Sequence, residues 1–557
     1  MPTGATSRLP NVVNCPMRRW NGWGDDTRDY PVPPALLELL TDRIGAGQPP
    51  DDVSLAAAVR QVSLSRLPEG TGPVGSLREI TGLLSSDPAD RLLHARGQSF
   101  PDLVAMRSGQ LGAVPDAVAH PRSGSDVRAL IDVARSLEAK IIPYGGGTSV
   151  VGGVTATASD APVLTVDLAG VSGLTRLNRR DQLATFGAGV TGPRLEALLR
   201  ADGLTVGHFP QSFELSTLGG WVATRSSGQQ SLGFGRIERL FAGGVVECPA
   251  GTLELPAFPA SAAGPDLREL VLGSEGRLGI ITEATVRVRP VPETDDVYAV
   301  FLPSWDAALE ATREIVQGGT PLSMLRLSTA EEAATQRTLA GDSRAAVVLD
   351  KGLAVRGVGA GRCVLLIGVM GTAALARQRW RSAYGVARRH GGVQVGRSLG
   401  RRWQRGRFRA PYLRNGLWER GFGIDTVETA TTWSLLPAML ARLEQVIGAA
   451  LQPVGERVHV VTHLSHVYPT GSSIYTTYAF RLGATAAETM ERWSRCKTAA
   501  SKAIVAIGGT ISHQHGVGLD HRDYLPAEKG ELGMAALRSL AESLDPDGRM
   551  NPGKLIA

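Results

Sequence analysis

A run of three glycines behind a predicted strand places the strongest constraint on the fold of this chain. The run stands in Pro143-Tyr-Gly-Gly-Gly-Thr-Ser149, at the end of the strand predicted over 140–144. Glycine has no Cβ, so it adopts positive φ angles and lets backbone N–H groups approach an anion closely. Such a nest binds pyrophosphate without a cationic side chain. Alone, the triplet is explained equally well by a plain turn.

Two further glycine-rich elements favour a binding site over a turn. The second element, HFPQSFELSTLGGWVATRSSG, begins at 208, and the third, GSEGRLGIITEATVRVRP, begins at 273. Both supply small side chains and close backbone approach, and the third runs into a predicted strand. Three such elements in this order are hard to obtain by chance.

Strands and helices alternate around these elements. Ser125 is predicted to cap a helix, a strand is predicted over 163–167, and Pro193 opens a second helix that Gly203 closes. This texture predicts an α/β or α+β fold. The apolar positions of the first helix recur at helical spacing: Val127, Leu130, Ile131, Ala134 and Leu137.

The chain is too long for one core at 557 residues. We expect an N-terminal arm with short helices over 1–95, with PALLELL as the clearest helix. A cofactor-binding domain is predicted over 96–293, because the rhythm of the sequence changes around PVPE (290–293). A second domain covers 294–505, and a helix with a Pro/Gly-rich tail covers 506–557.

Composition is that of an ordinary globular protein, with 43% hydrophobic and 20% charged residues. No stretch approaches the ~18 apolar residues of a membrane helix, and the N-terminal MPTGATSRLPNVVNC lacks the apolar core of a secretory signal. A cytoplasmic location is therefore expected. The four cysteines, Cys15, Cys248, Cys363 and Cys496, have no close pair, which predicts reduced thiols rather than disulfides or a cysteine-based metal site.

The chain carries a net charge of +6, concentrated in GRSLGRRWQRGRFRAPYLR (396–414). No zinc-finger, helix-turn-helix or aromatic RNA-binding pattern accompanies these arginines, so no nucleic-acid partner is expected. Two interpretations remain open: a solvated surface segment, or a positive face that attracts a phosphate-bearing lipid or substrate. The arginines are Arg397, Arg401, Arg402, Arg405, Arg407, Arg409 and Arg414.

A dinucleotide fold of the Rossmann type is a competing hypothesis, because GVGAGR (357–362) resembles its glycine fingerprint. That fingerprint requires a strand before it and a helix after it. Here a predicted strand, CVLLIGVM, follows the glycines. We therefore interpret the segment as a turn into a strand.

The segments PYGGGTS, PQSFELST, TRSS and GSEGRLG resemble the FAD-binding segments of the vanillyl-alcohol oxidase/p-cresol methylhydroxylase superfamily. Within it, the chain is most similar to the alkyldihydroxyacetonephosphate synthase family, on RRWNGWGDD (18–26), SMLRLS, SHVYPTGSSIYTTYAF (465–480) and HQHGVG (513–518). The resemblance runs from about residue 18 to the C-terminus. It implies an α+β fold in which FAD lies between two subdomains and a cap domain covers the flavin ring.

The resemblance also implies the residues that hold FAD. The first loop would bind the pyrophosphate, and it offers no histidine for the covalent link that many relatives have, so non-covalent FAD is expected. The implied residues are Pro143, Tyr144, Gly145, Gly146, Gly147, Thr148, Ser149, Gln211, Ser212, Phe213, Glu214, Leu215, Ser216, Thr217, Thr224, Arg225, Ser226, Ser227, Gly273, Ser274, Glu275, Gly276, Arg277, Leu278 and Gly279.

Histidines near the C-terminus raise the question of a metal site, because His459, His463 and His466 lie close together in the sequence. Relatives that oxidise 2-hydroxy acids resemble this region and use two histidines and a glutamate as metal ligands. His463 matches the first histidine, but Tyr475 and Gln514 stand at the other two positions. Phenol and amide are poor ligands for a divalent metal, so no metal is expected.

The synthase family implies catalytic roles instead. The tyrosine matching Tyr475 is its general acid/base, and the arginine matching Arg414 holds the substrate phosphate. A phenol needs burial and nearby positive charge to work near neutral pH, and we expect Arg414, His513 and His515 to supply that charge, with the two histidines on one face of a strand. Arg326 and His208 also match implicated positions. Gln514 departs from the family's run of three histidines, and glutamine cannot titrate.

These features predict an FAD-dependent enzyme of ether-lipid synthesis. It would exchange the acyl chain of acyl-dihydroxyacetone phosphate for a fatty alcohol without net redox change. Its expected partners are a phosphorylated, lipid-like substrate, a peripheral membrane surface and a second copy of the chain. The alternatives are an FAD-dependent oxidase or dehydrogenase of a hydroxy acid or glycerol-phosphate-like substrate, and a flavin- or lipid-binding module without activity.

Overall fold

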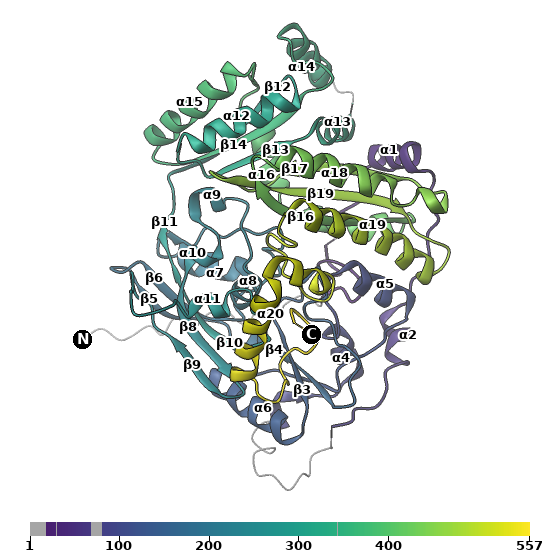
Figure 1. Ribbon diagram of the computed structural model, residues 1–557, viewed down its shortest axis with the longest axis vertical. Helices are drawn as coiled ribbons and strands as arrows, with labels where there is room; N and C mark the ends of the chain where they lie inside the picture. Colours follow the sequence, from purple (N-terminus) through teal and green to yellow (C-terminus); the bar gives the residue numbers. More distant parts are fainter. Residues whose placement is uncertain (1–17, 29, 68–80, 342–343, 557) are drawn as a thin grey trace, which may run out of the picture.

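Three larger sheets and one two-stranded sheet organise the protein in the computed structural model, which describes residues 18–28, 30–67, 81–341 and 344–556. Two of the sheets form the lower part of the molecule, and a large sheet covered by helices forms the upper part (Figure 1). The α+β class predicted from the sequence is confirmed. The predicted domain boundaries at 95, 293 and 505 stay predictions.

The first small sheet carries the glycine triplet at the end of a buried strand. Its strands follow the order β1 (Leu84–Ser85), β2 (Ala117–Ala119), β4 (Val163–Asp167) and β3 (Lys140–Tyr144). β2, β4 and β3 are parallel, and helix α6 (Gly124–Ser136) packs its apolar side on them. The capping residue is Ser123 and not Ser125, because Ser123 forms a reciprocal capping box with Asp126.

The second small sheet is antiparallel and carries the other two glycine-rich elements. Its order is β5 (Leu174–Asn178), β6 (Leu183–Gly187), β10 (Ile280–Arg287), β8 (Phe241–Cys248) and β9 (Gly251–Leu255). Helix α7 (Gly192–Arg200) has Pro193 in its first turn and ends before Gly203, as predicted. The remaining elements here are α8 (Leu218–Thr224), α9 (Ser231–Phe234), α10 (Ile237–Leu240), α11 (Arg268–Val271) and the pair β7 (Leu204–Thr205) and β11 (Arg289–Pro290).

The upper sheet, which we call the cap sheet, has the order β15-β12-β14-β13-β17-β19-β16, with β18 beside β19. Strand β14 follows GVGAGR directly, so the interpretation of that segment as a turn into a strand is confirmed. The strands are β12 (Thr294–Leu302), β13 (Met324–Ser328), β14 (Cys363–Gly371), β15 (Val393–Gln394), β16 (Phe422–Thr432), β17 (Val458–Leu464), β18 (Val467–Tyr468) and β19 (Gly471–Arg481).

Helices cover one face of the cap sheet and leave the other face turned toward the lower part (Figure 1). The covering helices are α12 (Trp305–Gln317), α15 (Ala373–Arg389), α18 (Leu436–Ala449) and α19 (Ala486–Ile507), and their apolar residues form the largest core with the sheet. On β19, Ile474 and Tyr478 join this core. Because strand side chains alternate, Tyr475 lies on the opposite face.

Shorter helices surround this frame. They are α1 (Pro34–Ile44), α2 (Leu55–Val59), α4 (Pro88–Leu93), α5 (Phe100–Ser108), α13 (Ala330–Leu339), α14 (Arg344–Val355), α16 (Ser398–Gly406) and α17 (Leu413–Trp418). The predicted PALLELL helix is thus confirmed as α1. Among the described residues, no helix is long and apolar enough to cross a membrane.

The C-terminal segment closes the structure over the lower part. Helix α20 (Leu525–Leu544) runs down the front of both small sheets (Figure 1). The tail then pairs with β3: the amide of Ile141 donates to Arg549 O, and that of Asn551 donates to Ile141 O. Sequence-distant segments therefore meet beside the glycine triplet.

Cys248, Cys363 and Cys496 are free and buried, in line with reduced thiols, whereas Cys15 lies outside the described residues.

Candidate active site

The glycine triplet packs so tightly on the second glycine-rich element that side chains are excluded. A Cβ on Gly146 would lie 1.9 Å from Leu215 O, and one on Gly145 would lie 2.4 Å from Thr217 Oγ1. Gly147 has a φ of 59°, which favours glycine. Only glycine fits at these positions, so the sequence leaves bare backbone here.

The third element contacts the first two. A Cβ on Gly276 would lie 2.9 Å from Pro143 Cγ, and one on Gly273 would lie 3.1 Å from Arg225 Cδ. The three elements therefore converge, as the sequence predicted. A cradle of close-packed glycine backbone suits the phosphates of a nucleotide cofactor, and the residues present fit FAD.

Small polar side chains fix the second element. Thr217 caps helix α8 by accepting from the amide of Gly220, and Ser216 accepts a hydrogen bond from Trp221 Nε1 at 2.7 Å. His208 Nε2 lies 2.8 Å from Ser226 Oγ, and its ring lies over Trp221. Burial and the charge of Arg236 lower the pKa of His208 to about 3, so His208 is neutral.

Glu275, in the third element, contacts a loop more than 240 positions further along the chain. Its buried carboxylate accepts from the amides of Val517 and Gly518, the latter at 2.7 Å. Burial raises the pKa of Glu275 to about 7. Glu275 therefore joins the third element to the loop that holds His513 and His515.

A row of polar side chains crosses the open face of the cap sheet. Strand register places Ser328 opposite His463, His463 opposite Tyr475, and Tyr475 opposite Glu428. Residues directly opposite one another in antiparallel strands share a face. Four strands therefore bring this row to the side that faces the lower part of the molecule.

Tyr475 lies in the middle of the row and is half-buried. Its ring centroid is 5.0 Å from that of His463 and 5.9 Å from that of His515. Burial raises the pKa of Tyr475 to about 12, and the positive charge of Arg414 offsets this only in part. The phenol is therefore protonated near neutral pH.

Arg414 belongs to this site and not to a solvated surface. Its Nη1 donates to Gln98 O at 2.5 Å, and its Nη2 lies 3.8 Å from Asp425 Oδ1. Within the described residues, Nε and Nη2 have no hydrogen-bond partner. A buried guanidinium with donors to spare is suited to bind a phosphate or carboxylate.

His513, Gln514 and His515 lie on a loop, so the expectation of a strand is wrong. Glu428 organises the loop instead: it accepts from the Gln514 amide at 2.7 Å, and its Oε1 lies 3.5 Å from His515 Nδ1. Burial lowers the pKa of both His513 and His515. Both are neutral near pH 7, which corrects the expectation that they supply positive charge to Tyr475.

Arg326 reaches the row through a carboxylate that the sequence analysis missed. Arg326 Nη2 donates to Glu332 Oε1 at 2.8 Å, and the same oxygen lies 3.1 Å from His463 Nδ1. Burial alone would raise the pKa of Glu332, but Arg326 and His463 lower it to about 2. Arg326 is thus an ion-pair partner that holds His463 beside Tyr475.

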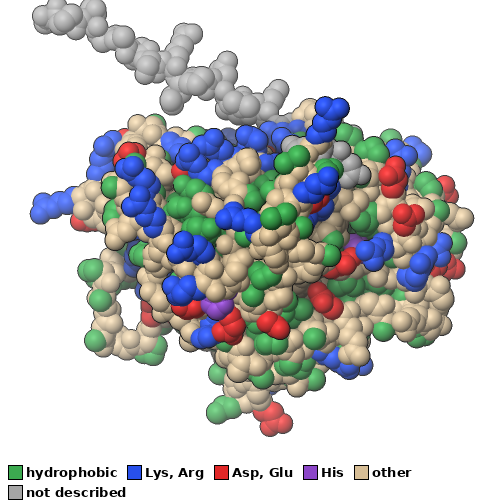
Figure 2. Space-filling view, turned by 90° about the horizontal axis from the view of Figure 1, so that it is seen from above, with side chains coloured by type: hydrophobic (Ala, Val, Ile, Leu, Met, Phe, Trp, Pro, Cys, Tyr) green, Lys and Arg blue, Asp and Glu red, His purple; other side chains and the backbone are tan. Residues whose placement is uncertain are grey.

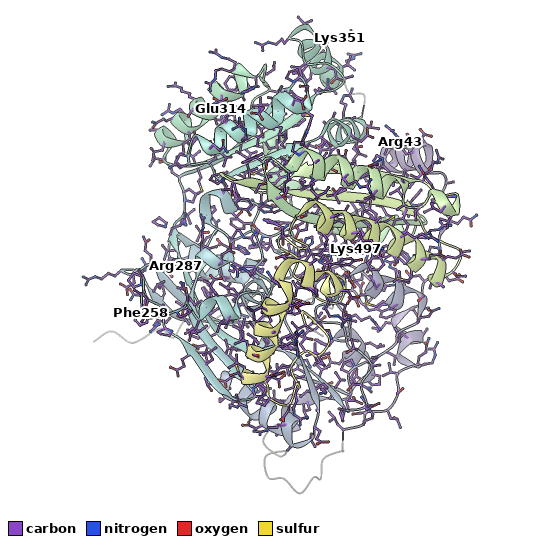
Figure 3. The ribbon with its side chains drawn as sticks, viewed as in Figure 1. Arg43, Phe258, Arg287, Glu314, Lys351 and Lys497 are labelled. Carbon is purple, nitrogen blue, oxygen red and sulfur yellow. The ribbon has the colours of Figure 1, made fainter. Side chains whose placement is uncertain are left out.

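Four further residues complete the site without having been predicted: Glu332, Glu428, Arg236 and Tyr468. Glu428 was detectable in principle, because it is a carboxylate inside the otherwise apolar and hydroxylic strand VETATT. Lys497 of α19, labelled in Figure 3, is buried and donates to Thr426 O at 3.4 Å. Among the described residues, no group of three His, Cys, Asp or Glu side chains is arranged to hold a metal ion.

The basic segment divides between the site and the surface. Like Arg414, Arg407 makes contacts inside the protein: its guanidinium lies over the rings of Phe209 and Phe408, and its Nη1 donates to Gln230 Oε1. Arg401, Arg402 and Arg405 are exposed on helix α16. Lys and Arg side chains are spread over the face seen in Figure 2, with hydrophobic patches between them.

Two family models match the chain: a FAD binding domain over residues 115–254 and the C-terminal domain of FAD linked oxidases over residues 291–555. Alkyldihydroxyacetonephosphate synthase of Dictyostelium discoideum is 30% identical, over 97% of this chain and 93% of that protein. A solved alkyldihydroxyacetonephosphate synthase structure is 26% identical, with a TM-score of 0.82 over 97% of this chain and 99% of that one.

A structure of p-cresol methylhydroxylase is 14% identical, covers 88% of this chain and 98% of that one, and has a TM-score of 0.64, which shows the shared fold. The predicted superfamily is confirmed, and the family models indicate FAD as the cofactor.

Proposed function

Because the chain belongs to the alkyldihydroxyacetonephosphate synthase family, we propose that it exchanges the acyl chain of acyl-dihydroxyacetone phosphate for a fatty alcohol. The bond between the carbon and the leaving carboxylate breaks, and a bond from that carbon to the alcohol oxygen forms. The alcohol proton leaves with the fatty acid, and no electrons are gained or lost. The observation that carries the proposal is that the protonated phenol of Tyr475 lies near the guanidinium of Arg414, whose Nε and Nη2 have no hydrogen-bond partner among the described residues.

Each side chain has a role that follows from its surroundings. Arg414 binds the substrate phosphate through Nε and Nη2, the two donors left over. Tyr475 starts protonated, so its phenolic oxygen is placed to give up a proton and recover it. The ion pair of Arg326 with Glu332 keeps the ring of His463 against that of Tyr475.

When bound, FAD would supply the chemistry for an acyl-to-alkyl exchange without net redox change. The residues that would hold it are the backbone of Gly145, Gly146 and Gly147 for the phosphates, with the second and third glycine-rich elements around them. Residues 143–149 contain no histidine, which supports non-covalent binding.

An isotope exchange assay tests the proposal. Purified protein, loaded with FAD, is mixed with palmitoyl-dihydroxyacetone phosphate and labelled hexadecanol in the absence of any oxidant. The expected result is labelled alkyl-dihydroxyacetone phosphate and one fatty acid released per ether formed. Hydrogen peroxide formation or flavin reduction without any ether product would indicate the oxidase or dehydrogenase instead.

The exposed arginines of helix α16 support contact with an anionic lipid surface, where a long-chain substrate would be found. Arg401, Arg402 and Arg405 project from a helix whose Leu399 and Trp403 pack on the cap sheet. Replacing all three arginines by glutamine should abolish sedimentation with phosphatidylserine vesicles and leave FAD content unchanged. Equal sedimentation of both proteins would rule out this contact. A cytoplasmic location and a homodimer stay predictions.

A further inference from the structure

Two side chains from outside its own loop hold the ring of His513. Its Nε2 lies 2.7 Å from Arg236 Nη1 and 2.6 Å from the hydroxyl of Tyr468. Arg236 Nη1 also donates to the Tyr468 hydroxyl at 3.1 Å. Arg236 precedes helix α10 in the lower part and Tyr468 belongs to β18 of the cap sheet, so the ring contacts residues from both parts of the molecule.

The donor chemistry of this contact decides where the ring proton resides. A guanidinium has only donors and keeps its protons in proteins, so Nε2 must accept from Arg236. The Tyr468 hydroxyl accepts from Arg236, which leaves its own proton free to point toward Nε2, and the single lone pair of Nε2 is then shared by the two donors. A histidine whose Nε2 only accepts is neutral and carries its proton on Nδ1.

We propose that Arg236, with Tyr468, fixes His513 as the neutral Nδ1–H tautomer, so that His513 is a hydrogen-bond donor in the site and not a proton acceptor. Nδ1 lies 3.9 Å from Glu428 Oε2, and within the described residues neither atom has a hydrogen-bond partner. The fixed N–H therefore points to the side where Glu428 lies opposite Tyr475. Arg236 acts through His513 and is a positioning residue.

Burial and the neighbouring cation of Arg236 favour the neutral ring, and the carboxylate of Glu428 opposes it. Burial, His466, Arg236 and His515 lower the pKa of His513 well below its usual range, and Glu428 is the carboxylate that faces it. Loss of the cation of Arg236 would raise the pKa of His513, but burial, the largest cause of its depression, would remain.

Arg236 also fixes two backbones, since Nη2 donates to Arg225 O and to His513 O, both at 3.0 Å. It thereby links the second glycine-rich element to the histidine loop. The proposal refines the proposed function, but the tautomer can be measured without any substrate.

Nuclear magnetic resonance of the FAD-loaded protein, labelled with ¹⁵N in the histidine rings, tests the proposal directly. The His513 signals are assigned by their loss in His513→Gln. The expected spectrum has an unprotonated Nε2 and a protonated Nδ1, unchanged from about pH 5 to pH 8, the range in which ordinary histidines titrate. A proton on Nε2, or titration of the ring near its usual pKa, would overturn the proposal.

Variants then identify Arg236 as the cause. In Arg236→Met the ring should no longer be confined to the Nδ1–H form, because the Tyr468 hydroxyl can accept from a protonated Nε2 as well as donate to a bare one, so a protonated Nε2 should appear in the spectrum. Arg236→Lys, which keeps a cationic donor, should restore the Nδ1–H form. Arg289→Gln is the matched control, because Arg289 donates to Gly233 O and Phe234 O instead. If Arg236→Met does not fold, Tyr468→Phe decides: Arg236 remains, so the neutral Nδ1–H form should persist, and its loss would refute the assignment to Arg236. An inactive protein with the expected tautomer would refute the proposed function alone.

Discussion

Replacing Tyr475 by phenylalanine removes the phenolic hydroxyl and little else. The ring contacts with His463 and His515 remain possible for phenylalanine, and the glycine-rich elements are untouched. If the hydroxyl moves a proton in the rate-limiting step, kcat should fall by about 10²–10⁴, the usual contribution of a positioned acid or base. KM and FAD content should change little.

The pKa of about 12 sets the pH dependence. It lies two units above the ordinary value of 10, which corresponds to an added cost of ionisation of about 3 kcal/mol. Near pH 7 only about one molecule in 10⁵ would carry the phenolate. A reaction that starts from the phenol is therefore independent of this group between about pH 7 and pH 10. A reaction that starts from the phenolate would accelerate about tenfold for each pH unit.

The assay is steady-state ether formation from pH 7 to pH 10 by wild type, Tyr475→Phe and Tyr478→Phe. Tyr478 is the matched control, because it lies on the same strand but joins the core on the opposite face and donates to Asp425. Tyr478→Phe should keep most of the activity. Full activity in FAD-loaded Tyr475→Phe, or a wild-type rate that climbs tenfold per pH unit, would refute the role assigned to the protonated phenol.

Three further predictions follow from neighbouring contacts. Arg414→Ala should raise KM for the phosphorylated substrate at least tenfold, since a charge-assisted hydrogen bond contributes roughly 1.5–3 kcal/mol. Its FAD content should stay unchanged, and an unaltered KM would show that Arg414 does not bind the phosphate. Glu332→Gln should lower the free energy of unfolding by about 3 kcal/mol at pH 7, from a pKa lowered from 4.5 to about 2. Because the folded-state pKa is depressed, this stabilisation is complete above pH 4.5 and is lost as the pH falls toward 2, so urea unfolding of the two proteins should converge there. Gly146→Ala should abolish FAD binding, because its Cβ would lie 1.9 Å from a backbone oxygen, and absorbance of the purified protein at flavin wavelengths measures this.

The cofactor cradle was predictable because consecutive glycines in a sequence indicate where the backbone packs too closely for a side chain. Wherever a Cβ cannot fit, only glycine can stand, so Gly145 and Gly146 mark the close approach in the sequence. The strands around the cradle were predictable from apolar runs bounded by turns. The helix cap was misplaced by two residues, since Ser123 and Ser125 are both good capping residues, and only the reciprocal contact with Asp126 distinguishes them.

The contacts of the reaction site were less predictable, because they join residues far apart in the chain. Glu428 binds a loop 86 positions away, and Arg236 reaches a ring 277 positions away. The alternation of His513 and His515 suggested a strand, but Glu275 and Glu428 instead hold their segment as a loop through its amides. Burial lowers the pKa of both histidines, so they are neutral and not positively charged as expected. A local sequence pattern does not show which residues a second domain will bury.

The visible spectrum of the flavin during turnover tests the central claim most directly. Wild-type protein loaded with FAD is mixed anaerobically with acyl-dihydroxyacetone phosphate and a fatty alcohol, and absorbance is followed while ether product is quantified. Exchange chemistry predicts many product molecules per FAD, with the flavin in its oxidised form once the substrates are consumed. Lasting flavin bleaching in proportion to the substrate consumed, without ether product, would contradict it.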